Sequence, residues 1–205
     1  MALTSFERLR TLASQLTVIR ACDLRKHGIH RQILKRALDR RFLVRVDRGL
    51  YTAVDRVVGW RQQLALACKR VPHGVVCLHS ALHYHGLVSS PSDTVWMAID
   101  RKARRPTLNG LQLRFVCFSG RALTQGVVNG RIDGVPVRIY STAKTVADCF
   151  KYRRKLGIEV AVHALRASIQ LNKCSRERLV HFAEICRVGK LLRPISTATE
   201  RGPAG

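Results

Sequence analysis

A short segment near the N-terminus carries side chains that suit recognition of a nucleic acid. Five apolar residues recur along it at helical spacing, namely Ile29, Ile33, Leu34, Ala37 and Leu38. The opposite side of such a helix collects Arg31, Gln32, Lys35 and Arg36. Cationic groups bind phosphate oxygens, and Arg and Gln also hydrogen-bond purine edges in the major groove of duplex DNA. We therefore expect residues 29–38 to form a recognition helix.

A shorter helix is expected just before it. Residues 21–27 have an amphipathic pattern, carry Arg25 and Lys26, and are followed by Gly28. Glycine readily adopts the left-handed conformation that closes a helix, so this position predicts a tight turn between the two helices.

A basic β-hairpin is expected just after the recognition helix. Residues 42–47 alternate with a period of two, Arg48-Gly49 suits a turn, and residues 50–52 return as a second strand. Arg45 and Arg48 would then lie on a wing, where basic groups usually meet the DNA backbone or the minor groove. The order of helix, turn, helix and hairpin is typical of a winged helix-turn-helix, and it predicts double-stranded DNA as the partner.

The composition favours the same kind of partner. The chain has 37 Lys and Arg residues against 13 Asp and Glu residues, a formal net charge of +24. A polyanionic partner is the simplest physical reason to tolerate such self-repulsion. The excess continues in residues 101–105 and 151–155, which predicts a basic surface on more than one domain. The alternatives are that these faces are merely solvated or that the arginine content reflects a biased genome.

The length of 205 residues leaves room for a small domain and a larger one. We expect a DNA-binding domain over residues 1–56, an α/β domain over 57–194 and a disordered tail over 195–205. The predicted fold class is α+β, a winged helix-turn-helix followed by a mixed α/β domain.

The second domain shows its own pattern of strands and helices. Strands at 94–99, 111–118, 130–132 and 135–140 predict a small, mostly antiparallel sheet. Helices are expected at 60–71, 79–86, 141–157, 158–170 and 175–187.

The cysteines and the apolar segments restrict the protein class. Seven cysteines are dispersed along the chain, mostly in apolar runs and without a Cys-x-x-Cys pair. We interpret them as reduced core residues and not as a disulfide framework or a zinc site. No segment approaches the ~20 apolar residues of a membrane-spanning helix, and the N-terminus lacks an apolar signal region. The sequence therefore predicts a cytoplasmic protein with no membrane partner.

Three histidines lie close together in the sequence, at His79, His83 and His85. His79 and His83 are four residues apart and would share one helix face, which is a spacing found in metal sites. Imidazoles at a helix corner also serve as hydrogen-bonding packing residues. Because no Cys or acidic residue stands nearby as a third ligand, we favour packing and expect neither a metal nor a cofactor.

Ordered motifs along the chain carry a family resemblance. They are Arg48-Gly49-Leu50-Tyr51, Ser80-Ala81-Leu82, His85-Gly86-Leu87 and the block from Tyr140 to Arg153. Together they resemble the AbiEi family of antitoxins, which are regulators associated with type IV toxin-antitoxin systems. The similarity runs over residues 24–193, and its most specific part is 142–165.

The resemblance implies two activities. An N-terminal winged helix would bind inverted repeats in the promoter of its own operon and repress it. A C-terminal domain would counteract a nucleotidyltransferase-like toxin without forming a stable complex with it.

Within the motif block, Asp148 most resembles a functional acid. It lies four residues after Lys144 and three before Lys151, and a helix brings both pairs onto one face. One interpretation is a catalytic or antitoxin role for a motif of Lys144, Asp148 and Arg153. We favour the other, an ion-pair or capping network that fixes this helix to its neighbours, with Arg153 and Arg166 as further candidate members.

The rival interpretation is an enzyme that acts on nucleic acid, either a metal-dependent nuclease or a nucleotidyl transferase. A nuclease needs clustered carboxylates, and Asp100-Arg101-Lys102 has no second acid at a matching spacing. A transferase would have a Gly-Ser turn followed by paired aspartates, whereas Ser119-Gly120 has the reverse order. We therefore expect no enzymatic activity. Binding to structured RNA stays open on charge, although no strand carries the closely spaced aromatic residues of an RNA-recognition sheet.

Overall fold

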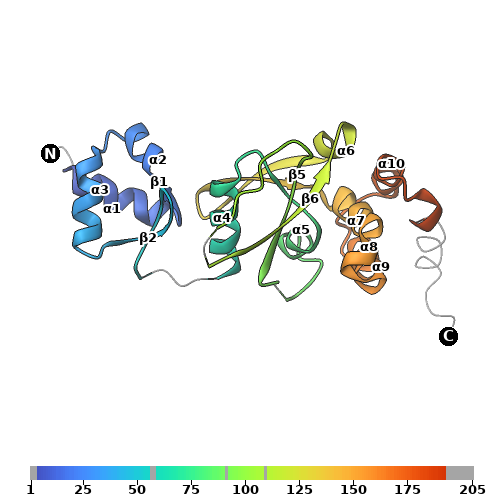
Figure 1. Ribbon diagram of the computed structural model, residues 1–205. Coiled ribbons are helices and arrows are strands. Elements are labelled where there is room, and N and C mark those ends of the chain that lie inside the picture. Colours follow the sequence, from blue (N-terminus) through green and yellow to red (C-terminus); the bar gives the residue numbers. More distant parts are fainter. Residues whose placement is uncertain (1–3, 56–58, 91, 109, 193–205) are drawn as a thin grey trace. The chain divides into compact units, whose positions relative to one another are not determined.

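The computed structural model describes residues 4–55, 59–90, 92–108 and 110–192. Within them the protein has a mixed α and β structure (Figure 1). It divides into two compact units, and the first gathers Met1–His73, Pro106–Leu113 and Gly130–Val137. The tail predicted over 195–205 lies outside the described residues. No helix in the described part of the chain combines the length and the apolar character needed to cross a membrane.

The first unit begins with helices and a small antiparallel sheet. In chain order it contains α1 (Ser5–Gln15), β1 (Ile19–Arg20), α2 (Ala21–Lys26), α3 (Arg31–Asp39), β2 (Leu43–Asp47), β3 (Leu50–Ala53) and α4 (Trp60–Arg70). The strands lie in the order β1-β3-β2, and both neighbouring pairs are antiparallel. The two helices and the hairpin expected between residues 21 and 52 are therefore present.

The first unit extends beyond residue 56, where the sequence suggested a boundary. Helix α4 packs against β3. Its residues Ala65 and Leu66 share one apolar cluster with Val18, Leu50 and Val135. These contacts join segments that are distant in the sequence, which is why local composition did not indicate them.

Burial along α3 follows the predicted pattern. Leu34 and Ala37 are buried, as is Ile29 in the preceding turn, and Ile33 and Leu38 pack against the same apolar cluster. One side of α3 is thus fixed by apolar contacts, which leaves its other side exposed.

The turn between α2 and α3 has the predicted geometry. Gly28 has a φ of 64°, and the amide of Ile29 donates to the carbonyl of Leu24 at 2.9 Å. Helix α3 then begins after His30, whose Nδ1 accepts the amide of Gln32 at 3.3 Å. This cap satisfies a helix donor that would otherwise lack a partner.

The β2-β3 hairpin contains an irregularity next to its turn. Arg45 lies opposite Tyr51, and the register then shifts so that Asp47 lies opposite Leu50. Gly49 follows with a φ of 74°. A bulge of this kind increases the local twist and re-aims the side chains beside it.

The second unit contains most of a five-stranded sheet and six helices of the described chain. Its elements are β4 (Val75–Val76), α5 (Leu78–Tyr84), β5 (Thr94–Asp100), β6 (Gln112–Phe118), α6 (Arg121–Thr124), β7 (Val127–Ile132), β8 (Val135–Tyr140), α7 (Thr142–Lys151), α8 (Arg153–Leu156), α9 (Ile158–Gln170) and α10 (Arg176–Ile185). The strand order is β6-β5-β4-β8-β7, and parts of β6, β7 and β8 count with the first unit.

Two details of the second unit differ from the sequence-based expectation. The central strand β4 was not predicted, because two residues are too few to show a period. It pairs antiparallel with β5 but parallel with β8, through Val76 and Ile139. The helix expected over 141–157 is also divided, since α7 ends at Lys151 and α8 begins at Arg153.

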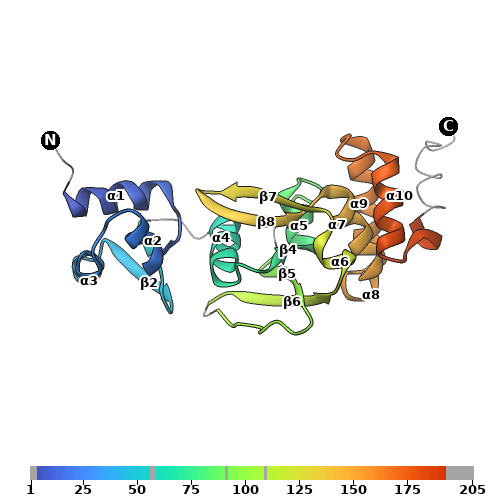
Figure 2. The same ribbon diagram turned by 90° about the horizontal axis from the view of Figure 1, so that it is seen from above.

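Helix α7 lies at the centre of the second unit. Every residue from Thr142 to Phe150 is buried. The helix contacts α5, α9 and α10, and Figure 2 shows α9 and α10 beside it. Because α7 is enclosed on several sides, its polar side chains must find their partners inside the protein.

Gly126 lies close to α7, so a substitution at this position tests how tightly the helix is packed. Gly126 has a φ of 78°, and a Cβ built there would lie 2.8 Å from Cβ of Lys144 and 2.9 Å from the ring of Phe182. We expect Gly126→Ala to lower the free energy of unfolding by about 1–2 kcal/mol for a left-handed alanine and by about 1–3 kcal/mol more for the overpacking.

Gly86→Ala is the matched control in chemical denaturation, because Gly86 has a φ of 68° and open space around the Cβ position. Equal destabilisation by the two substitutions would contradict the close packing at Gly126.

Candidate nucleic-acid interface

All eight residues that the sequence assigns to a DNA interface are exposed on the first unit. They are Arg25, Lys26, Arg31, Gln32, Lys35, Arg36, Arg45 and Arg48. They belong to α2, α3 and the β2-β3 hairpin, and α3 contacts both α2 and β2. The fold thus places them on adjacent elements, and their role in DNA binding stays a prediction.

A surface groove of about 630 Å³ borders the turn between α2 and α3. Arg25, His30 and Arg31 are among the residues that line it. The N-terminal end of α3 also carries the partial positive charge of a helix dipole. This combination of guanidinium groups and a helix N-terminus suits a phosphate group of a nucleic acid.

The hairpin presents its cations next to the bulge. Arg45 is exposed, and its Nε donates to the carbonyl oxygen of Asp47 at 3.3 Å. Arg48 is exposed beside Gly49 at the turn. The hydrogen bond of Arg45 orients its guanidinium near the end of the hairpin.

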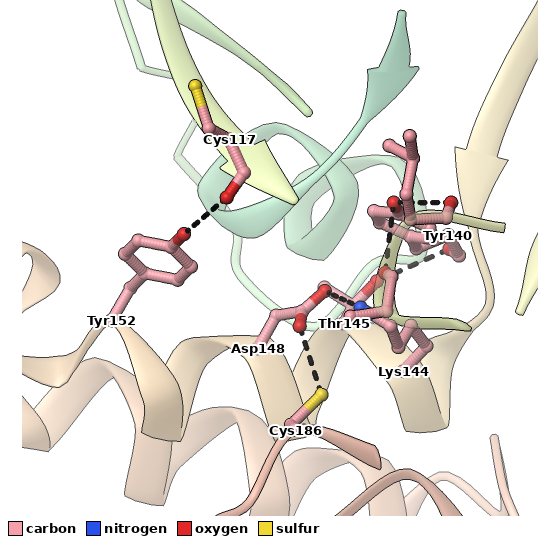
Figure 3. A network of polar contacts seen from close by, with 9 residues as sticks. Cys117, Tyr140, Lys144, Thr145, Asp148, Tyr152 and Cys186 are labelled. Atoms are coloured by element: carbon pink, nitrogen blue, oxygen red, sulfur yellow. Dashed lines mark hydrogen bonds and ion pairs between the residues drawn. The ribbon is translucent and has the colours of Figure 1, made fainter. Parts of the chain in front are cut away.

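The second candidate feature is an ion pair buried inside the second unit. Lys144 and Asp148 are both fully buried, and Nζ lies 2.5 Å from Oδ2 (Figure 3). The ammonium also lies 4.1 Å from the centre of the Tyr140 ring and 4.5 Å from that of Phe118. The Cys186 thiol donates to Oδ1 of Asp148 at 3.2 Å. Each charged group therefore has several partners within the core.

Burial dominates the electrostatics of this pair. It raises the pKa of Asp148 above the ordinary value, and the neighbouring Lys144 ammonium offsets only part of that effect. Burial and the Asp148 charge raise the pKa of Cys186 to about 12. A protonated thiol is a poor nucleophile, so the geometry and the pKa of Cys186 both favour packing over chemistry.

The structure contains the Lys144–Asp148 ion pair that the sequence suggested, while the other expected members of the network make different contacts. Lys151 is exposed, and its Nζ lies 5.1 Å from the centre of the Phe118 ring. Nη1 of Arg153 donates to the carbonyl oxygen of Phe150 at 3.0 Å and so caps the end of α7. Arg166 is exposed on α9.

Sequence spacing did not indicate Cys186 or the two aromatic rings as members of this cluster. Cys186 is 38 residues from Asp148 in the sequence, and Phe118 lies at the end of β6, well before α7 in the chain. Only the i, i+4 spacing of Lys144 and Asp148 carried a local signal.

His83 and His85 contact backbone carbonyl oxygens, whereas Nδ1 of His79 is buried without a hydrogen-bond partner among the described residues. His83 Nδ1 lies 3.2 Å from the carbonyl oxygen of Val88, and His85 Nε2 lies 2.7 Å from that of Tyr140. Burial lowers the pKa of His79 and of His85. Within the described ranges, no three His, Cys, Asp or Glu side chains are grouped to hold a metal ion.

Asp100 and the cysteines are also candidate chemical groups in the sequence. Oδ1 of Asp100 accepts the amide of Lys102 at 2.9 Å, which is a turn contact. The seven cysteines are free thiols: Cys68, Cys77, Cys149 and Cys186 are buried, Cys117 and Cys174 are half-buried, and Cys22 is exposed.

Comparison with known proteins identifies a structural neighbour. The crystal structure of the RV2827C protein from Mycobacterium tuberculosis matches 96% of this chain and 82% of that chain, with a TM-score of 0.58 and 12% sequence identity. The likeness extends over both units and concerns the fold. The sequence matches no protein-family model and no curated protein.

The buried pair makes a prediction about stability. Asp148→Asn should lower the free energy of unfolding by about 3–5 kcal/mol, because it leaves the Lys144 ammonium buried without a counter-ion. Adding Lys144→Met to the same chain should recover part of the loss. Thermal and urea unfolding measure both.

Asp100→Asn is the control, since Asp100 is exposed and its substitution should stay within about 0.5 kcal/mol. An Asp148→Asn chain as stable as the unaltered protein would refute the structural role of the pair.

Proposed function

We propose that this protein is a DNA-binding transcriptional regulator whose first unit acts as a winged helix-turn-helix. The observation that carries the proposal is the exposed set of cations on α2, α3 and the β2-β3 hairpin. Helix α3 buries one side in an apolar cluster and exposes Arg31, Gln32, Lys35 and Arg36 on the other. That division suits a helix that enters a major groove.

The exposed side chains suit two kinds of contact. Gln32 and Arg36 lie on α3 and have the planar donor groups that recognise purine edges. Arg45 and Arg48 on the hairpin suit phosphate contacts, which fix position but carry little sequence information. We therefore assign base readout to α3 and backbone contacts to the hairpin.

The resemblance to the AbiEi antitoxins supports a narrower proposal. On that basis the protein represses its own operon through inverted repeats in the promoter, and its second unit counteracts a nucleotidyltransferase-like toxin without a stable complex. The most specific block of the resemblance, 142–165, covers α7, α8 and part of α9. Since residues 142–150 are buried, any antitoxic contact from this block must use exposed residues such as Lys151, Arg154 and Lys155.

The DNA-binding proposal is tested with a duplex from the promoter of the protein's own operon. Competition gel shifts at physiological salt should show a preference of roughly 10³-fold or more over random duplex. Gln32→Ala and Arg36→Ala should each cost ~1–3 kcal/mol on the specific duplex and relax the preference at one operator position.

Arg48→Ala is the contrasting variant, because the loss of one phosphate contact weakens all sequences alike and reduces the salt slope by about one. Lys190→Ala, an exposed change in the second unit, is the neutral control. Equal affinity of the unaltered protein for promoter and random duplex would refute specific binding.

The antitoxin proposal is tested by co-expression, from an unrelated promoter, with a nucleotidyltransferase-like toxin encoded immediately downstream. The unaltered chain should restore growth. The triple substitution Lys151→Gln, Arg154→Gln and Lys155→Gln should reduce that rescue, because it removes three exposed positive charges of the motif block. Gln32→Ala should leave rescue intact, and so should Arg166→Gln, which removes one exposed charge of α9 just outside the block. Failure of the unaltered chain to restore growth would contradict toxin antagonism.

A further inference from the structure

Two consecutive cations at the end of α4 contact the elements that carry the proposed DNA interface. The Lys69 ammonium lies 2.5 Å from Oδ2 of Asp23, and both side chains are largely buried, with 11% and 14% of their surface exposed. The same Oδ2 accepts the amide of Arg20 at 2.9 Å, which caps the start of α2. Lys69 therefore fastens the N-terminal turn of α2 to α4.

Arg70 lies close to a carboxylate of the hairpin, although its side chain is 30% exposed and the two groups form no hydrogen bond in the described structure. Its Nε lies 3.3 Å from Oδ2 of Asp47, whose side chain is 9% exposed. The same Nε donates to the carbonyl oxygen of Thr107 at 3.1 Å. Arg70 thus joins the end of β2 to α4 and to the segment Pro106–Leu113 of the first unit.

The positions of the two acids in the sequence make these pairs relevant to DNA binding. Asp23 is two residues from Arg25, and Asp47 is next to Arg48. An uncompensated carboxylate beside DNA phosphates would weaken binding. In the three-stranded sheet β1-β3-β2, β2 is an edge strand, so a contact at the end of β2 influences how the hairpin is oriented.

We propose that Lys69 and Arg70 are positioning residues that set α2 and the β2-β3 hairpin in the orientation needed for operator recognition. They act through Asp23 and Asp47 and do not themselves read the DNA. This inference rests on the proposed DNA-binding function, and it adds α4 to the elements on which sequence preference depends.

A series of charge-removing variants distinguishes two roles of Lys69. In one it orients α2, and in the other it only neutralises the charge of Asp23. Lys69→Met leaves Asp23 unpaired and should weaken binding to both operator and random duplex. Combining it with Asp23→Asn removes the unpaired charge and keeps an oxygen that accepts the Arg20 amide. The double variant should regain affinity for random duplex, yet its operator preference should stay about tenfold below that of the unaltered protein, the size of one lost base contact.

Lys69→Arg is the conservative variant and should retain most of the preference, because it keeps a cation opposite Asp23. Lys173→Met, an exposed change in the second unit, controls for the loss of one positive charge. Recovery of the full operator preference by the double variant would overturn the proposal, since neutralisation alone would then explain the pair.

Amide hydrogen exchange of the free protein tests the fastening without DNA. Lys69→Met should speed exchange in residues 21–28, and Arg70→Met should do so in residues 43–53, while α9 and α10 stay unchanged. Unchanged exchange in both segments would overturn the proposal. If exchange rises as expected but the unaltered protein has no operator preference, the role in readout fails together with the proposed function, and the fastening of α2 and the hairpin to α4 stands.

Discussion

Carboxylates are scarce in this chain, with 13 acidic residues against 37 Lys and Arg residues. Asp23, Asp47 and Asp148 are each paired with a Lys or Arg from a neighbouring turn or another element, and their side chains are largely buried. Removing one partner of a buried pair leaves the other charge uncompensated, so these few acids have large structural effects. The large excess of Lys and Arg over acidic residues leaves the chain strongly positive, which favours attraction of a polyanion.

The Lys144–Asp148 pair in the second unit shows that a buried ion pair needs further partners around each charged group. Lys144 and Asp148 lie on a helix that is enclosed by α5, α9 and α10. The carboxylate has both the ammonium and the Cys186 thiol as partners, and the ammonium lies against two aromatic rings. A buried pair of this kind adds little net stability over apolar residues, but it is satisfied in only one packing of the surrounding helices. Its position in the motif block therefore has a structural explanation.

Local periodicity predicted the elements that carry the candidate interface. The apolar spacing of α3 and the glycine after α2 are properties of neighbouring residues, and both are found in the structure. The strand β2 also forms, but its burial does not alternate as expected, since Leu43 is buried and Val44 is exposed. The i, i+4 spacing of Lys144 and Asp148 likewise indicated their pairing. The parts that sequence reasoning missed depend on distant segments: the two-residue strand β4, the thiol of Cys186, and the contacts of α4 with α2 and the hairpin. Such contacts have no local period, so one sequence does not indicate them.

The likeness to the RV2827C protein concerns the fold at 12% identity, so the functional account depends on the exposed residues of this chain. Its central claim is that α3 and the β2-β3 hairpin contact operator DNA, although residues 101–105 and 151–155 are also strongly basic. Photo-crosslinking from 5-iodouracil placed along a promoter duplex, with the attached peptides identified by mass spectrometry, tests this claim directly. The account predicts crosslinks within residues 25–36 and 43–50 that a promoter competitor removes and random duplex does not. Crosslinks confined to residues 101–105 and 151–155, or equally removed by both competitors, would contradict it.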